Sequence, residues 1–305
     1  MRAATDPTEA RRLLELGAQV FAAAKDRDVS RADVVTALPK AWYPESSWRD
    51  DLAWAAAELA LAGQALDDPR TAGWLDAGTL LALGHLEYEA GAASLDVYDT
   101  SAIAFADLVR ALRASSHGTD VNEPLLLDGL RAILAAATTR AAADPFGAAV
   151  DQTEYDAVSD AFGLVAVARM YRELAGDGSF EGLGATQLGW ALGANAWGVS
   201  FVVGVGTTYP GCPHHMIGNL ATTADGAPIV LRGAVVNGPN AASLFEHGLG
   251  APMDGMRPCP AKGRDGYREF TGHGSRFVDD VRAWQTVEPA IDMAATATLA
   301  LALSR

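Results

Sequence analysis

The chain has 305 residues, of which half are hydrophobic and 20% are charged, so it is long enough and apolar enough to fold around a well-filled core. Its formal net charge of −15, with no cluster of Lys and Arg, disfavours nucleic acid and anionic membrane surfaces as partners. No stretch reaches the ~18 apolar residues of a membrane span, and the first residues contain no apolar segment typical of an export signal.

Helix-type periodicity and frequent alanine predict a mainly α-helical chain. Asp6, Pro7 and Glu9 form a typical helix start, and Ser47 with Asp50 repeats that capping pattern before a second helix. Further helices are expected at about 72–89, 101–112, 124–142, 155–174, 182–192 and 289–303.

The tract from residue 193 to residue 284 differs from the rest of the chain, because Gly and Pro are frequent and helical periodicity is absent. Its strand-like pieces are 201–203 and 229–231. Loop-rich tracts of this length tend to be functional. Two loops in the tract carry Cys212 and Cys259, which could form one disulfide or remain two free thiols.

Two segments of the tract carry side chains suited to chemistry. Residues 193–215 end in His214 and His215, and residues 277–290 contain Glu288 directly before a proline. Two histidines, a carboxyl group and several aromatic rings are the parts needed for acid–base chemistry on a polar, ring-shaped ligand.

These two segments resemble the signature regions of glycoside hydrolase family 9, the inverting β-1,4-glucanases. Residues 193–215 are similar to its Gly-x-Asn-x-x-Gly-x-Ser-Phe-Val-x-Gly-x-Gly pattern and the Pro-His-His turn that follows it. Residues 233–240 and 43–57 are similar to two further segments of the family, and all four matches occur in the family's order. In residues 277–290 the positions in register are Phe277, Asp279, Trp284 and Glu288.

The resemblance implies an all-α fold, an incomplete (α/α)6 barrel of helical hairpins with long active-site loops, in which residues 1–305 form a single catalytic domain. It covers the C-terminal two-thirds of that domain, and the family's Asp-Ala-Gly-Asp motif, whose carboxylates activate the attacking water, belongs to the remaining part. Residues 75–79 include Asp-Ala-Gly-Thr, which lacks the second Asp and lies on the wrong side of the 43–57 segment.

By the same resemblance, Glu288 is the general acid that protonates the leaving glycosidic oxygen. Pro289 is expected to open the last helix, which places Glu288 at a helix start where the dipole favours an ionised carboxylate. Burial against Trp284, or a neighbouring carboxylate such as Asp279 or Asp280, would have to oppose that effect. The alternative interpretation is an ordinary carboxylate at a helix start.

Several polar and aromatic side chains are expected to contact sugar. The histidines would donate hydrogen bonds to hydroxyl groups and the aromatic rings would stack on sugar faces, with loop packing and core packing as the respective alternatives. Met216 and Thr208 replace an Arg and an Asn of the family, so we predict a β-linked glucan or a related polysaccharide as the substrate. The residues expected to bind substrate are His214, His215, Tyr209, Trp197, Trp42, Tyr43, Asp279 and Trp284.

A calcium ion could bind near the start of the second helix, although hydrolysis is expected to require no cofactor. Ser46, Asp50, Asp51 and Asp99 align with positions that hold calcium in many family members, and oxygen-rich clusters suit this ion. The alternative is a capped helix start with solvated carboxylates. Zinc at the histidine pair would lack a third ligand with metal spacing.

Three functions fit these observations. The first is hydrolysis of cellulose-like β-glucans with inversion. The catalytic base would then be supplied from outside this chain, and the chain alone would be inactive. The second is carbohydrate binding or scaffolding without catalysis, and the third is an unrelated helical interaction protein. An incomplete ring of helices exposes apolar faces, so an N-terminal complementing segment or an oligomer is expected to cover them. The resemblance also implies an extracellular location.

Overall fold

The computed structural model describes residues 5–25, 47–89, 95–115, 122–226, 229–251, 253, 255–260, 266–270 and 272–304. The chain divides into two compact units: Met1–Leu134 with Met170–Gly178, and Ala135–Arg169 with Ser179–Arg305. The single catalytic domain expected from the sequence stays a prediction. Within the described ranges, no helix combines the length and the apolar character that crossing a membrane would require.

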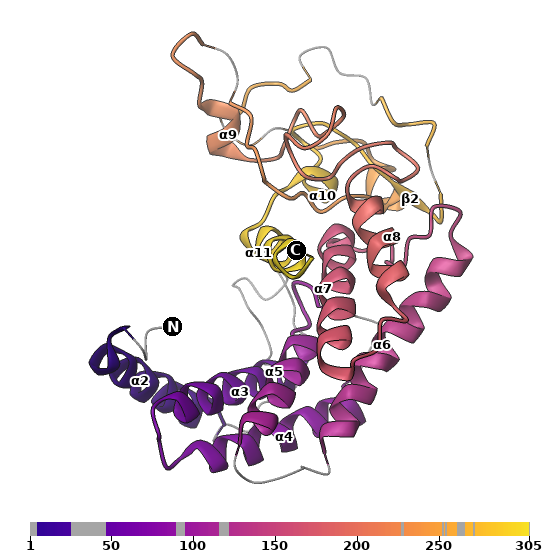
Figure 1. Ribbon diagram of the computed structural model, residues 1–305. Helices are drawn as coiled ribbons and strands as arrows, with labels where there is room; N and C mark the ends of the chain where they lie inside the picture. The colour runs from indigo at the N-terminus through magenta and orange to yellow at the C-terminus, as the bar shows by residue number, and fades with distance from the viewer. Residues whose placement is uncertain are drawn as a thin grey trace. The chain divides into compact units, whose positions relative to one another are not determined.

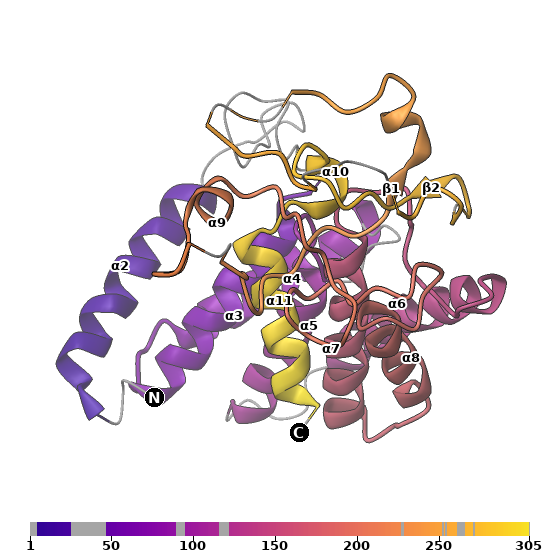
Figure 2. The same ribbon diagram turned by 90° about the horizontal axis from the view of Figure 1, so that it is seen from above.

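The first unit is built around helix α3. This helix packs against α2, α4 and α5, and the views in Figures 1 and 2 show these helices side by side. Its inward face is rich in alanines without exposed surface, including Ala53, Ala56 and Ala60, and these small side chains let the helix backbones approach closely. The helices of this unit are α2 (Pro7–Lys25), α3 (Arg49–Ala65), α4 (Thr71–Tyr88), α5 (Ser101–Ala114) and the first part of α6 (Glu123–Ala143).

The second unit combines helices with a long irregular tract. Helices α7 and α8 lie side by side, since a Cβ atom added at Gly184 of α8 would lie 3.3 Å from the Cβ atom of Ala168 on α7 (Figure 1). The irregular tract contains one antiparallel pair of two-residue strands. The elements here are most of α7 (Ala157–Ala175), α8 (Glu181–Ala191), α9 (Met216–Leu220), β1 (Asn240–Ala241), η2 (Ala242–Phe245), β2 (Ser275–Arg276), α10 (Trp284–Val287) and α11 (Ile291–Leu303).

The predicted helices agree with the observed ones to within about two residues at most ends, which is the usual precision of helix boundaries. The predicted start of the first helix is confirmed, because the Glu9 amide donates to Asp6 Oδ1 at 3.0 Å. Ser47 is not the N-cap of α3. Trp48 occupies that position, and the Ser47 hydroxyl instead donates to Asp50 Oδ1 at 2.7 Å.

The predicted strands are largely absent from the described part of the tract. Residues 229–231 form no strand, and residues 201–203 contribute only the isolated bridge between Val202 and Val235. The last helix begins at Ile291 rather than Pro289, because Pro289 forms a bridge with Val236 and its backbone continues the extended run.

Residues 75–79, which partly match the family's Asp-Ala-Gly-Asp motif, lie inside α4. Asp76 is exposed, whereas Gly78 faces α3 and α5. A Cβ atom at Gly78 would lie 2.8 Å from Leu108 Cδ2 and 3.0 Å from Ala56 Cβ. This segment therefore forms a helix-packing surface.

Replacing Gly78 by valine should lower the free energy of unfolding by about 1–3 kcal/mol, because the added methyl groups overpack the contact with α3 and α5. The matched change Gly73→Val on the same helix, where an added Cβ meets no atom within 4 Å, should stay within about 0.5 kcal/mol of the wild type. Urea unfolding of the three proteins checks this, and equal losses in both variants would contradict the packing assigned to Gly78.

Candidate active site

Glu288 lies in an extended segment between two helices of the second unit. It directly follows α10 and has φ −82° and ψ 119°, while α11 begins three residues later. The prediction that Glu288 stands at the first turn of the last helix is therefore wrong, and the helix-dipole argument built on it does not apply. Its side chain is half-buried.

The buried side chain of Asn237 holds the Glu288 backbone in place. The Glu288 amide donates to Asn237 Oδ1 at 2.8 Å, and the Asn237 amide donates to the Glu288 carbonyl at 3.3 Å. The Asn237 side-chain nitrogen donates to the carbonyl of Trp284 at 3.0 Å. Asn237 has no exposed surface, so these bonds are shielded from water.

Tyr155 contacts the Glu288 carboxylate and also lies next to the ring of Trp284. The Tyr155 hydroxyl donates to Glu288 Oε2, and the Tyr155 and Trp284 rings lie 6.2 Å apart between centroids. The Trp284 side chain is well exposed, with 45% of its surface accessible. Tyr155 thus connects a carboxyl group with an exposed aromatic ring, and these two kinds of group can protonate a sugar and stack on it.

Sequence reasoning missed Tyr155 and Asn237 as site residues. Tyr155 was expected to begin a helix, but α7 starts at Ala157 and leaves the tyrosine in the preceding turn. Asn237 lies in an Asn-Gly-Pro-Asn run, and a polar side chain between an apolar segment and a Gly-Pro turn was the available signal.

The Nδ1 atom of His214 faces a backbone carbonyl, whereas that of His215 faces a backbone amide. His214 Nδ1 lies 2.5 Å from the Val281 carbonyl and must donate there, so Nε2 of the neutral ring is an acceptor. His215 Nδ1 accepts from the Gly218 amide at 3.0 Å as the N-cap of α9, so its neutral ring carries a proton on Nε2. The His214 amide also donates to the Val287 carbonyl at 2.8 Å, which brings this histidine next to the Glu288 segment.

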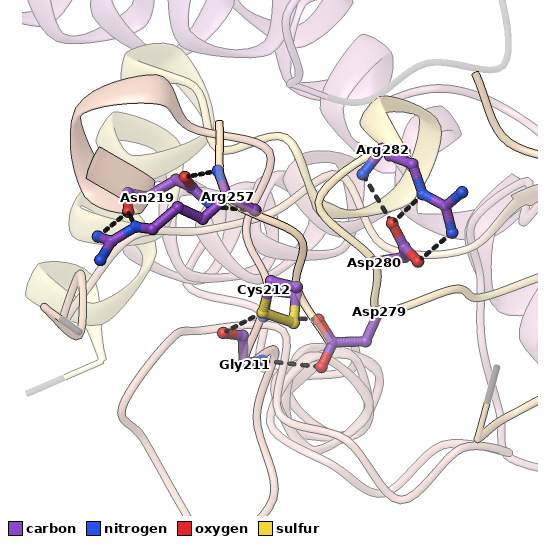
Figure 3. Close-up of a disulfide and its surroundings, with 8 residues drawn as sticks. Gly211, Cys212, Asn219, Arg257, Asp279, Asp280 and Arg282 are labelled. Atoms are coloured by element: carbon purple, nitrogen blue, oxygen red, sulfur yellow. Dashed lines mark hydrogen bonds and ion pairs between the residues drawn. A yellow bond between two sulfur atoms is a disulfide. The ribbon is translucent and has the colours of Figure 1, made fainter. Parts of the chain in front are cut away.

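Asp279 and a disulfide anchor the loop that precedes the histidines (Figure 3). The Asp279 carboxylate accepts from the amides of Gly211 and Cys212 at 2.8 and 2.9 Å. Cys212 and Cys259 form a disulfide, which decides between the two thiol states that the sequence allowed. Both Asp279 oxygens are thus engaged in holding the loop, while the expected contact of Asp279 with sugar stays untested.

Asp279 and Asp280 have opposite electrostatic environments. Burial raises the pKa of Asp279, although the amides of Gly211 and Cys212 partly oppose the change. Burial also acts to raise the pKa of Asp280, but hydrogen bonds from Arg282 at 2.7–2.9 Å and its positive charge leave that pKa lowered. Both carboxylates have partners other than Glu288.

Trp197 belongs to the core of the second unit. Only 6% of its surface is exposed, its Nε1 donates to the Phe270 carbonyl at 2.7 Å, and its ring contacts those of Phe201 and Phe277, each at 6.3 Å between centroids. The core-packing alternative therefore describes Trp197, which cannot offer a face to a sugar ring in this arrangement.

Tyr209 is half-buried and lines a cavity of about 310 Å³ beside the disulfide. Trp42 and Tyr43 lie outside the described residues.

Comparison with known proteins decides which family this site belongs to. The family model described as "Glycosyl hydrolase family 9" matches residues 1–301. The chain belongs to glycosyl hydrolase family 9. The family resemblance predicted from the four segments is thereby confirmed.

The individual family 9 proteins that the chain resembles share only part of its sequence or a low identity with it. "Endoglucanase 14" of Arabidopsis thaliana is 36% identical over an alignment that covers 21% of this chain and 17% of the relative. The endoglucanase from the termite Nasutitermes takasagoensis is 20% identical, with a TM-score of 0.68, over 99% of this chain and 61% of that one. The cellulase Cel9M of C. cellulolyticum in complex with cellobiose is also 20% identical, with a TM-score of 0.65, over 99% of this chain and 60% of that one.

These matches confirm the predicted all-α fold class, that of the family 9 (α/α)6 barrel. The chain spans 61% of the length of the termite endoglucanase and 60% of that of Cel9M, and less than half of some other solved structures that it matches.

The carboxylates expected to hold calcium in family 9 lie together in the first unit. Asp50 is buried and accepts from Ser47 Oγ and from the Thr100 amide, at 2.7 and 2.9 Å. Burial raises the pKa values of Asp51 and Asp99, and the neighbouring Asp50 charge adds to both. A cation would relieve this repulsion, so the described carboxylates fit an oxygen-liganded ion. Ser46 lies outside the described residues, and calcium stays a proposal.

The raised pKa of Asp279 predicts a pH-dependent stability. The folded chain binds a proton at Asp279 more readily than the unfolded chain, so this contribution to stability is fully present below the ordinary pKa of 3.8 and is lost as the pH rises through the folded value. Urea unfolding between about pH 3 and pH 6 should therefore show the wild type losing stability relative to Asp279→Asn as the pH rises.

Asp280→Asn is the matched control for that measurement. Because the pKa of Asp280 is lowered in the folded chain, its contribution to stability is present above the ordinary pKa of an Asp side chain. That contribution is lost as the pH falls through the pKa of the folded state. The wild type should then gain stability relative to Asp280→Asn as the pH rises. Equal slopes for the two variants would contradict the environments assigned to these carboxylates.

Proposed function

We propose that this chain carries the acid-bearing part of the active site of a β-1,4-glucan hydrolase that works with inversion. The observation that supports this most directly is Glu288 itself in a family 9 chain: its carboxylate accepts from Tyr155, whose ring lies 6.2 Å from that of the exposed Trp284. Asn237 holds the Glu288 backbone. Solved neighbours named as endoglucanases or cellulases, one of them in complex with cellobiose, support the substrate class.

In this proposal Glu288 gives its proton to the glycosidic oxygen as the bond from that oxygen to C1 breaks, while water attacks C1 from the opposite face. The Tyr155 hydroxyl then donates to the carboxylate that remains, a charge-assisted bond that stabilises the product side of the proton transfer. Trp284 stacks on a sugar face, and His214, His215 and Tyr209 contact hydroxyl groups. An extracellular location would suit a polymeric substrate.

The base for this reaction is proposed to come from outside these 305 residues, either from an N-terminal segment or from a partner. The printed sequence contains no Asp-Ala-Gly-Asp, and its nearest approach, residues 76–79, lies within helix α4 and has Thr79 in place of the second Asp. Inverting hydrolysis needs a carboxylate that activates water on the face opposite the acid. The chain by itself should therefore bind glucan and turn it over very slowly.

A carbohydrate-binding protein without catalysis is the second candidate. It is favoured by the same missing motif and by Met216 and Thr208, which replace two polar side chains of the family pattern. Titration of the chain with cello-oligosaccharides, followed by an assay for reducing ends, tests both candidates. Absence of binding would contradict both, and efficient turnover would contradict the assignment of the base to another segment.

Azide can test Glu288 without the base, because the azide anion attacks C1 without losing a proton. With azide present, the chain should convert cello-oligosaccharides slowly into α-glycosyl azides: the C1–O bond breaks, a C1–N bond forms, and Glu288 protonates the leaving oxygen. Mass spectrometry and proton NMR of the product give its mass and anomeric configuration. A β-glycosyl azide would contradict inversion.

The variant Glu288→Gln should lower the azide reaction by about 10²–10⁴-fold, the usual contribution of a general acid. Glu246→Gln, which changes an exposed glutamate of the same unit, is the control and should react like the wild type. Equal rates for Glu288→Gln and the wild type would refute the acid role of Glu288.

A further inference from the structure

Three potential metal ligands converge in the first unit, on α3 and the end of α4. Asp50, His85 and Glu89 each offer one ligand atom, and these atoms all lie within 4.8 Å of one another. Asp50 and His85 are buried, and Glu89 is half-buried. Neither His85 nor Glu89 belongs to the set of oxygen ligands expected from the sequence.

His85 has a buried ring nitrogen without a hydrogen-bond partner. The side chain is 2% exposed, and its Nδ1 forms no hydrogen bond with any of the described residues. A buried polar atom left in this state is unfavourable and calls for an explanation, such as an ion that occupies the site. A buried ring whose Nδ1 stays without a hydrogen-bond partner among the described residues is the alternative without metal.

The distance between His85 and Glu89 favours an ion between them. His85 Nδ1 lies 3.6 Å from Glu89 Oε2, which is too long for a hydrogen bond. Two ligands of one tetrahedral zinc ion, each bound at 2.0–2.2 Å, lie about 3.4 Å apart. The observed separation is thus close to that of two atoms that share a metal.

Neighbouring groups hold the two carboxylate ligands, and the end of α4 places the histidine beside one of them. His85 and Glu89 are four residues apart, on the same face at the end of α4, and the Glu89 amide donates to the His85 carbonyl at 2.9 Å. The Arg49 guanidinium donates to Glu89 Oε1, and the Arg49 amide lies 3.3 Å from Glu89 Oε2. Asp50 is fixed by Ser47 and Thr100. Such outer contacts orient ligands before a metal binds.

We propose that Asp50, His85 and Glu89 bind one divalent transition-metal ion of the Zn²⁺ type. One imidazole and two carboxylates form a mixed nitrogen and oxygen set that suits zinc, whereas calcium takes six to eight oxygen ligands. The two possible sites share Asp50, so calcium and zinc would compete for it. The ion would tie the start of α3 to the end of α4, and its role would be structural.

The test begins with the full chain stripped of metal by a chelator and titrated with Zn²⁺ and Co²⁺. We expect one equivalent to bind, with a visible Co²⁺ absorption band and an increase in Tm. His85→Gln and Glu89→Gln should each weaken binding by at least about tenfold. The controls Glu87→Gln, an exposed glutamate on the same helix, and His247→Gln, an exposed histidine of the other unit, should bind like the wild type.

Circular dichroism of the metal-free variants verifies that they fold, and Asp50→Asn replaces any variant that does not. Zn²⁺ or Co²⁺ binding of unchanged affinity in His85→Gln and Glu89→Gln would overturn the proposed metal site. Binding of Ca²⁺ with no binding of Zn²⁺ or Co²⁺ would assign the cluster to an all-oxygen ion instead. No binding of any of the three metals would also overturn the proposal.

Discussion

The geometry of the candidate site depends on Asn237, whose polar groups are all engaged. Its backbone amide donates to the Glu288 carbonyl, and its side-chain oxygen accepts from the Glu288 amide. Its side-chain nitrogen donates to the Trp284 carbonyl, and its own carbonyl accepts from the Val158 amide at 3.1 Å. Gly238 follows with φ +91°, and a Cβ atom there would collide with the Val158 side chain. A buried amide and a glycine that tolerates this conformation therefore fix the segment that carries Glu288.

The irregular tract around this amide satisfies its backbone groups without a regular sheet. The Val203 amide donates to Ala234 at 2.8 Å, and the Val236 amide donates to Phe201 at 3.1 Å. The buried rings of Trp190, Phe201 and Phe277 form a packed aromatic cluster in the same unit. A core of this kind explains how loops with two-residue strands can hold the side chains of the candidate site at fixed positions.

The helices could be predicted from the sequence because their information is local. Apolar spacing and end residues fixed α4 and α5 to within two residues at each end. The irregular tract could not be predicted in this way, because its pairings, such as Val236 with Pro289, join residues far apart in the sequence. The segment of Glu288 was misread for that reason, since a local rule favours a helix after Pro289 and a tertiary bridge overrides it. Family resemblance pointed to Glu288 and the histidines as candidates, whereas the positions of Tyr155, Asn237 and His85 depend on tertiary contacts that no local pattern reveals.

The central claim is that Glu288 and Trp284 form one sugar-binding, proton-donating site. A crystal structure of the chain with a bound cello-oligosaccharide tests it most directly. The account predicts a glycosidic oxygen at hydrogen-bond distance, about 2.6–3.2 Å, from the Glu288 carboxyl group, with a sugar ring stacked on Trp284. An oligosaccharide bound elsewhere on the chain, or one in this site with Glu288 directed away from every glycosidic oxygen, would contradict it.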